Sequence, residues 1–274
     1  PANGVPGEIP STPPALPATP GADTPAPTPV TPVANKIDAV KSAGVPLQTG
    51  PTSFTVPYSI VVGNQGTATV YNAQANDFLS NTYPAPASFT VSGYAVAAGS
   101  GSPTCTPAAS FTGTGTSTAL LSGTNDLTTG QSCVISFTVK VNYNATPIPT
   151  TRNNVVASGM GADSATPNPG YTGVTQDPTT GAITGGTPPS GATTTDNSSN
   201  VNPPAGGVPG AVPSTPALPA TPGADTPAPT PVTPVANKIA AVKSAGVPVQ
   251  PGPTSFDVPY SIVVGNQGTA TVYN

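Results

Sequence analysis

The chain has 274 residues, of which 40 are proline, 30 are glycine and only 6% are charged. Six basic residues against ten acidic ones cannot follow a phosphate backbone, which excludes nucleic acid as a partner. No run of 18 apolar residues occurs, so we expect no membrane span in this segment. Hydroxyl and amide side chains must therefore keep the surface in water, which is typical of secreted proteins at the cell surface.

Histidine is absent from the sequence, and this removes the usual general base, the commonest transition-metal ligand and any Ser-His-Asp triad. The carboxylates are spread singly, and tryptophan is absent too, so a glycosidase groove is not expected. We predict that the protein is not an enzyme, and that it has no catalytic residue and no cofactor.

One long segment of the chain occurs twice. Residues 15–72 recur as residues 217–274 with a constant offset of 202, and such a fixed period indicates a tandem array. We expect the 274 residues to be a window on a longer array; the alternative is a protomer that gives an unpaired leading segment to a neighbour. Four of the 58 aligned positions differ, namely Asp38/Ala240, Leu47/Val249, Thr49/Pro251 and Thr55/Asp257.

The first element in chain order is a proline-rich segment at residues 1–34. Proline at almost every second or third position removes backbone donors and fixes φ near the polyproline II value. The pattern predicts an extended linker, and a second linker of the same kind is expected at residues 205–236.

From Asn35 onward the period changes to the alternation of a half-buried β-strand. A turn rich in glycine and asparagine at residues 63–66 ends the first long strand, and residues 67–79 are expected to supply the return strand. NKIDAVKSAG, before it, is read as strand or irregular structure. The side chains predicted to share the inward face of the first long strand are Phe54, Val56, Tyr58, Ile60 and Val62.

Further short strands are predicted at intervals marked by turns. Their ranges are 87–97, 105–113, 117–123, 133–143 and 153–161, followed by a hairpin about Asp177-Pro178 and a last strand in TTTDNSSNVN. In the strand 133–143, Lys140 points to solvent and the inward set is Cys133, Ile135, Phe137, Val139, Val141 and Tyr143. This succession predicts an all-β sandwich over residues 35–204, and residues 237–274 begin the next repeat.

Five blocks of the sequence resemble, in order, the bacterial extracellular "conserved repeat domain" family. The blocks are NKIDAVKSAG, VPYSIVVGNQGTATVYNAQANDFL, TYPAPASFTVSGY, LLSGTNDLTTGQSCVISFTVKV, and NNVVASG with the later TTTDNSSN. The resemblance implies an Ig-like β-sandwich in a large repetitive surface protein, with a structural or adhesive role. It implies no catalytic residues.

Cys105 and Cys133 are the only cysteines, and each lies beside a predicted strand. Two cysteines allow one pairing, and a disulfide would stabilise the fold by roughly 3 kcal/mol and require an oxidising compartment. The alternative is a pair of buried free thiols.

Calcium binding and glycosylation are two further roles that Asn and Asp side chains could have, although such side chains ordinarily cap turns. Ca²⁺ is the one metal that the sequence could bind through loop oxygens, but no pair has the spacing of a known calcium loop, and we expect no metal site. Asn144 and Asn197 begin glycosylation triplets. The Asn/Asp pairs considered for calcium are Asn76-Asp77, Asn125-Asp126 and Asp196-Asn197.

An amide bond between a lysine and an asparagine, as in some pilus sandwiches, would require a buried lysine beside a carboxylate. Lys140 is expected to face solvent, and Asp38 is replaced by Ala240 in the second copy. A hydrated surface is therefore the expected place for these side chains.

We expect the protein to be a structural subunit of an extracellular filament, sheath or stalk, whose partner is a neighbouring copy of itself. Strand addition across the repeat boundary, by residues 253–264 or by linker residues 207–234, would supply the contact. The residues predicted to make it are Phe256, Val258, Tyr260, Ile262 and Val264.

The alternative function is that of a surface adhesin, in which the repeats form a stalk or bind surface glycans weakly and together. Exposed aromatic side chains gathered on one surface would indicate it. The candidates are Tyr83, Tyr94 and Tyr171.

Overall fold

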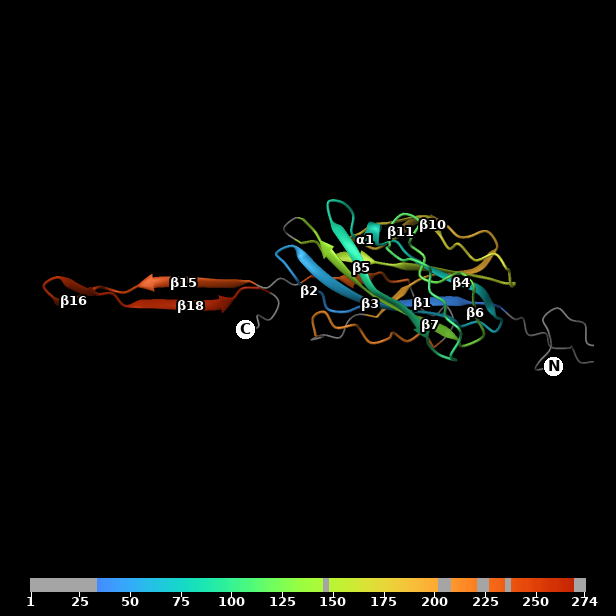
Figure 1. Ribbon diagram of the computed structural model, residues 1–274, viewed down its shortest axis with the longest axis horizontal. Helices are drawn as coiled ribbons and strands as arrows, with labels where there is room; N and C mark the ends of the chain where they lie inside the picture. The colour runs from blue at the N-terminus through green and yellow to red at the C-terminus, as the bar shows by residue number, and fades with distance from the viewer. Residues whose placement is uncertain (1–33, 145–147, 202–207, 221–226, 235–237, 269–274) are drawn as a thin grey trace, which may run out of the picture. The chain divides into compact units, whose positions relative to one another are not determined.

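The computed structural model of the chain describes residues 34–144, 148–201, 208–220, 227–234 and 238–268. Nearly all regular structure in these ranges is β-strand, so the predicted all-β sandwich is confirmed (Figure 1). Within the same ranges, no helix has the length and apolar character needed to cross a membrane. The predicted linker at residues 1–34 lies, apart from its last residue, outside the described part.

The first layer of the sandwich is a mainly antiparallel sheet. It consists of β1 (Ile37–Ala43), β2 (Leu47–Gln48), β3 (Ser53–Asn64), β5 (Ser88–Ala98), β7 (Ser132–Asn142) and β13 (Ser199–Val201). The strand order is β13-β1-β3-β7-β5, with β2 also paired to β3. Only the β1–β13 pair is parallel. NKIDAVKSAG thus forms a full strand in the interior of this sheet.

The second layer contains the strand expected to return beside β3. It consists of β4 (Val70–Asp77), β6 (Asn125–Leu127), β9 (Val155–Met160) and β12 (Ala192–Asn197), in the order β12-β9-β4-β6. The predicted strand exists, but its expected partner was wrong, because β4 pairs with β9 and β6. The side chain of Asn64 donates to the carbonyls of Ala68 (2.7 Å) and Leu127 (2.8 Å), which holds the connection near β6 as the chain crosses between layers.

The hydrophobic core lies between these layers and contains every inward residue predicted for the two long strands. None of these side chains is more than 4% exposed, whereas Lys140 on the same strand is exposed, as predicted. Tyr58 and Phe137 lie opposite each other in the β3–β7 ladder, with ring centroids 5.3 Å apart. Period-2 alternation therefore gave the right buried face in both strands.

Two of the predicted strands, at 105–113 and 117–123, are irregular connections instead. They retain only isolated bridges, Pro107 with Leu121 and Asn76 with Ala119 among them. Proline supplies no backbone donor, and glycines in this connection take positive φ, so a regular ladder does not continue here.

The remaining elements of the first repeat lie around one end of β4. They are helix α1 (Leu79–Thr82), β8 (Thr151–Asn153) and the predicted hairpin of β10 (Thr172–Gln176) with β11 (Ile183–Thr187). In the hairpin turn, Asp177 Oδ1 accepts hydrogen bonds from the backbone N–H groups of Thr179 (2.7 Å) and Thr180 (2.9 Å).

The second copy forms strands of its own. They are β14 (Thr230–Val232), β15 (Ile239–Ala245), β16 (Val249–Gly252), β17 (Ser255–Asp257) and β18 (Tyr260–Asn266). β15 pairs with β18 and β16 with β17, whereas β14 pairs with β8 of the first repeat.

Candidate functional site

The contact between the two copies is a short antiparallel ladder. Thr230 lies opposite Asn153 and Val232 opposite Thr151, so a linker segment of the second copy extends β8 of the first. Thr230 is fully buried and Val232 is 1% exposed, and Val232 belongs to the hydrophobic core of the sandwich. Burial of such a valine contributes about 2 kcal/mol. The linker at residues 205–236 therefore supplies part of the preceding unit's core.

An earlier part of the same linker covers the outer face of the first sheet. The Gln65 side chain donates to the carbonyl of Pro219 (2.9 Å), and a Cβ added at Gly63 would clash with the Leu218 side chain. The outward side chains of β3 were expected to be exposed, but Ser59 and Val61 are at most 4% exposed. The half-buried reading of β3 is thus wrong, because linker residues lie over the face that its polar pattern assigns to water.

A cluster of three polar side chains lies inside the core near β14. The Nζ atom of Lys41, on β1, contacts Oδ2 of Asp77, at the end of β4. Asn153, on β8, donates from Nδ2 to the same Asp77 oxygen at 3.4 Å. All three residues are fully buried. The three strands therefore bring an amine, a carboxyl and a carboxamide together in one enclosed place.

The electrostatics of this cluster favour uncharged groups. Burial lowers the pKa of Lys41, with Asp77 opposing the shift, and burial raises the pKa of Asp77, with Lys41 and Asn153 opposing it. Oδ1 of Asp77 has no hydrogen-bond partner among the described residues, which adds to the cost of a charged carboxylate there. Both directions point to a neutral amine beside a protonated acid.

Aromatic side chains form the wall of the cluster. Lys41 Nζ lies 4.5 Å from the ring centroid of Tyr58 and 5.6 Å from that of Phe137. The hydroxyl groups of Tyr58 and Tyr83 are 2.7 Å apart. Thr82, in α1, donates from Oγ1 to Asn153 Oδ1 at 2.9 Å, which fixes the orientation of the carboxamide.

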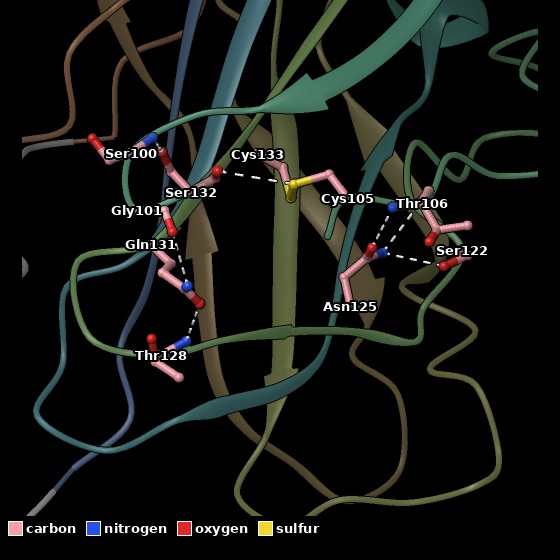
Figure 2. Close-up of a disulfide and its surroundings, with 10 residues drawn as sticks. All are labelled: Ser100, Gly101, Cys105, Thr106, Ser122, Asn125, Thr128, Gln131, Ser132 and Cys133. Carbon is pink, nitrogen blue, oxygen red and sulfur yellow. Dashed lines mark hydrogen bonds between the residues drawn. A yellow bond between two sulfur atoms is a disulfide. The ribbon is translucent and has the colours of Figure 1, made fainter. Parts of the chain in front are cut away.

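The disulfide between Cys105 and Cys133 is present, with the two Cα atoms 5.8 Å apart (Figure 2). It joins the irregular connection after β5 to the beginning of β7. Asn125 clamps the residue after Cys105, since its Oδ1 accepts from Thr106 N (2.6 Å) and its Nδ2 donates to Thr106 O (3.2 Å). The crosslink and the clamp hold a segment that has almost no ladder of its own.

The residues predicted to make the inter-repeat contact lie elsewhere. All five are exposed, from 37% at Val258 to 64% at Val264, and the described contacts with the first repeat come from linker residues. Their packing against a further copy stays a prediction. The five are Phe256, Val258, Tyr260, Ile262 and Val264.

The tyrosines considered as a glycan surface do not form an exposed group. Tyr83 is 2% exposed and lies in the core, and the Tyr94 hydroxyl donates to the carbonyl of Leu120. Tyr171 is half-buried. These positions therefore do not show the aromatic surface that would favour an adhesin.

The Asn/Asp pairs considered for calcium serve as hydrogen-bond partners of the backbone. Asp126 Oδ1 accepts from Asn72 N (3.0 Å), Asp196 Oδ2 accepts from Ala39 N (2.7 Å), and Asn76 Oδ1 accepts from Tyr171 N (3.0 Å). Among the described residues, no three His, Cys, Asp or Glu side chains are grouped as metal ligands would be.

The two glycosylation candidates lie in different settings. Asn144 is exposed, and its Nδ2 donates to the carbonyl of Pro86 at 2.8 Å. Asn197 is half-buried at the end of β12, opposite Val156. Glycosylation at either asparagine stays a prediction.

Sequence reasoning considered Lys140 and Asp38 for a lysine–asparagine bond and missed Lys41. The expected hydrated position of Asp38 was wrong: Asp38 is fully buried, with Oδ1 2.9 Å from Lys36 Nζ. β1 is buried along its whole length, so a lysine in its interior cannot reach solvent. The repeat gave no signal that singled out Lys41: it recurs as Lys243, but so do all except four of the 58 aligned residues, Lys36 among them. Asn153 lies outside the repeated segment, and its partners come from β4 and α1.

No protein family, curated protein or solved structure matches this chain.

Proposed function

We propose that this chain is a structural subunit of an extracellular filament, sheath or stalk, in which each repeat is held by the linker of the following repeat. The observation that carries the proposal is β14: three linker residues of the second copy complete the edge at β8, with Thr230 and Val232 buried in the first unit. We also propose that the repeat unit is an Ig-like sandwich and that it is located outside the cell.

Three features support a mechanical role. The linker contacts the first unit both through β14 and along the outer face of β3, so successive repeats share a core and a surface. The disulfide suits an oxidising compartment. The low charge and high proline content suit an array that stays extended and in water through hydroxyl and amide groups.

A substitution in β14 tests whether its contact with the first unit stabilises that unit. In a chain of these 274 residues, Val232→Asp places a charge in the core, and we expect a loss of about 3 kcal/mol in unfolding free energy, or roughly 6–12 °C in Tm. Thermal unfolding followed by circular dichroism measures it.

Val30→Asp in the same 274-residue chain is the matched control, since Val30 holds the repeat-equivalent position and β8 is already paired with β14. We expect a Tm within about 1 °C of the parent. Equal shifts for the two variants would refute the role of β14.

Electron microscopy tests the assembly itself. Filaments from native material that carries these repeats should show one axial period per 202-residue unit. A glycan-binding screen of the same material distinguishes the adhesin alternative, which requires saturable binding to a sugar and no regular axial period.

A further inference from the structure

The buried cluster of Lys41, Asp77 and Asn153 lies beside the contact between repeats, and its own chemistry is that of an amide-forming site. The amine and the carboxamide both contact one oxygen of Asp77, Nζ of Lys41 directly and Nδ2 of Asn153 at 3.4 Å. None of the three side chains is exposed. An amine held beside a carboxamide, with an acid between them, has the parts needed for transamidation.

Each partner is prepared for reaction by its surroundings. A lysine attacks a carbonyl only as the neutral amine, and the complete burial of Lys41 favours that form. Thr82 Oγ1 donates to Asn153 Oδ1 at 2.9 Å, where negative charge would develop as the amine adds to Cγ. Burial also excludes water, which would compete with the amine as nucleophile.

We propose that the side chains of Lys41 and Asn153 become joined by an intramolecular amide bond after folding, with Asp77 as the catalytic proton carrier. With the amine neutral and Asp77 protonated, Lys41 Nζ attacks Cγ of Asn153. The Cγ–Nδ2 bond then breaks, Asp77 gives its proton to Nδ2, which leaves as ammonia, and Asp77 takes one of the two protons of Nζ in return. The other proton stays on the new amide nitrogen, Asp77 ends protonated, and no oxidant or reductant is needed.

The bond would tie β1 to β8, the strand that binds β14 of the next repeat. Thr230 lies opposite Asn153 in that ladder, and its Oγ1 donates to the carbonyl of Lys41 at 3.3 Å. A residue of the following repeat thus contacts both residues of the proposed crosslink. The inference stands on the cluster alone and does not depend on the filament proposal.

Intact mass spectrometry of the full, reduced and denatured chain tests the bond directly. Loss of ammonia lowers the mass by about 17 Da from the value calculated from the sequence. The unmodified mass in protein shown to be folded by circular dichroism would overturn the proposal. A loss of about 18 Da, as water, would also overturn it, because it would indicate condensation of Lys41 with Asp77 instead.

Trypsin locates the bond, because it does not cleave after an acylated lysine. Cleavage after Lys41 should be absent, and residues 37–140 should remain covalently attached to the peptide that begins at Asn153. Lys243 is the internal control: it is the repeat equivalent of Lys41, and the equivalents of Asp77 and Asn153 lie beyond residue 274 in repeat register. Cleavage after Lys243 should be normal, and equal cleavage after both lysines would contradict the assignment.

Variants separate catalysis from folding. Lys41→Arg and Asp77→Asn should each retain the full mass, whereas Lys243→Arg should lose about 17 Da relative to its own calculated mass, as the parent does. If Lys41→Arg fails to fold, the parent mass and the tryptic map still decide the matter. Loss of ammonia that persists in folded Lys41→Arg would exclude Lys41 as the nucleophile.

Discussion

The same sequence occurs twice in this molecule, in a buried pair of strands and in an exposed one. β1 and β3 pair from Ile37 with Asn64 to Ala43 with Tyr58, and β15 and β18 pair in the identical register 202 residues later. β1 is entirely buried, whereas Ile239 and Val242 are 61% and 67% exposed. In Figure 1 the second pair stands as a ribbon without a covering layer.

The comparison separates what the local sequence determines from what the rest of the unit determines. Pairing and register follow from the two segments themselves, and so does one side-chain contact: Lys243 Nζ lies 3.9 Å from the ring centroid of Tyr260, as Lys41 lies near Tyr58. Burial requires β7 and the second layer, whose counterparts in the second copy are not among these residues. The two segments therefore determine their own pairing and register, whereas their burial depends on the rest of the repeat.

The largest expected effect is on amide hydrogen exchange. Amides of β1 should open only with the whole sandwich, whereas those of β15 should open locally at little cost, so exchange at 37–43 should be at least about 10³-fold slower than at 239–245. Mass spectrometry of peptides from both segments measures this. Similar exchange in the two copies would mean that the hairpin of the second copy is covered in solution.

Replacing the repeat-equivalent tyrosines Tyr58 and Tyr260 by alanine should give the next largest difference between the copies. Tyr58→Ala removes a fully buried ring and should cost about 4 kcal/mol, whereas Tyr260→Ala, at a position 58% exposed, should change stability by less than about 0.5 kcal/mol. Denaturant unfolding of both variants gives the two values. If Tyr260→Ala costs as much as Tyr58→Ala, the second copy is not the exposed member of the pair.

Alkaline pH should destabilise the buried copy. Burial raises the pKa of Tyr143 to about 12, and it also raises the pKa values of Tyr58 and Tyr83. The unfolded chain ionises its tyrosines near pH 10, so the stability is fully present below that pH and is lost as pH rises through about 12. The loss should reach about 1.4 kcal/mol per pH unit for each tyrosine.

Tyrosinate absorbance and circular dichroism, recorded together against pH, measure this transition. Tyr58→Phe should weaken the pH dependence of unfolding, and Tyr260→Phe should leave the midpoint unchanged. Ionisation of all eight tyrosines before any loss of structure would contradict the expectation.

The smallest expected change in stability comes from giving the first copy the aspartate that the second copy has at the equivalent position, Asp257. Thr55 lies opposite Lys140 in the β3–β7 ladder, so Thr55→Asp should add a cross-strand ion pair worth about 0.5 kcal/mol, or about 1–2 °C in Tm. Salt should reduce the gain. The reverse change, Asp257→Thr, should have no measurable effect, and a fall in Tm for Thr55→Asp would count against the predicted pair.

Sequence patterns predicted the two long strands and their buried faces because alternation reports which side chains meet a core. They did not predict that β4 leaves β3 for the other layer, because the Asn64 side chain holds that connection through the carbonyls of Ala68 and the distant Leu127. They also misplaced the outer face of β3, whose cover comes from residues more than 140 positions away. The disulfide could be predicted from composition, whereas the Lys41 cluster could not, because its members are brought together from three strands.

In the proposed filament, the chain between β13 and β14 would provide a reserve of length. Residues 202–229 separate these two strands, and both strands pair with the same sandwich. A pulling force from the following repeat would load β14 in shear against β8 before it reached residues 202–229. Once β14 slid free, the segment could extend by up to about 3.1 Å per residue, on the order of 90 Å, while the sandwich itself stayed folded. Each repeat would then lengthen under load, and the first contact to break would be the three-residue ladder between β14 and β8.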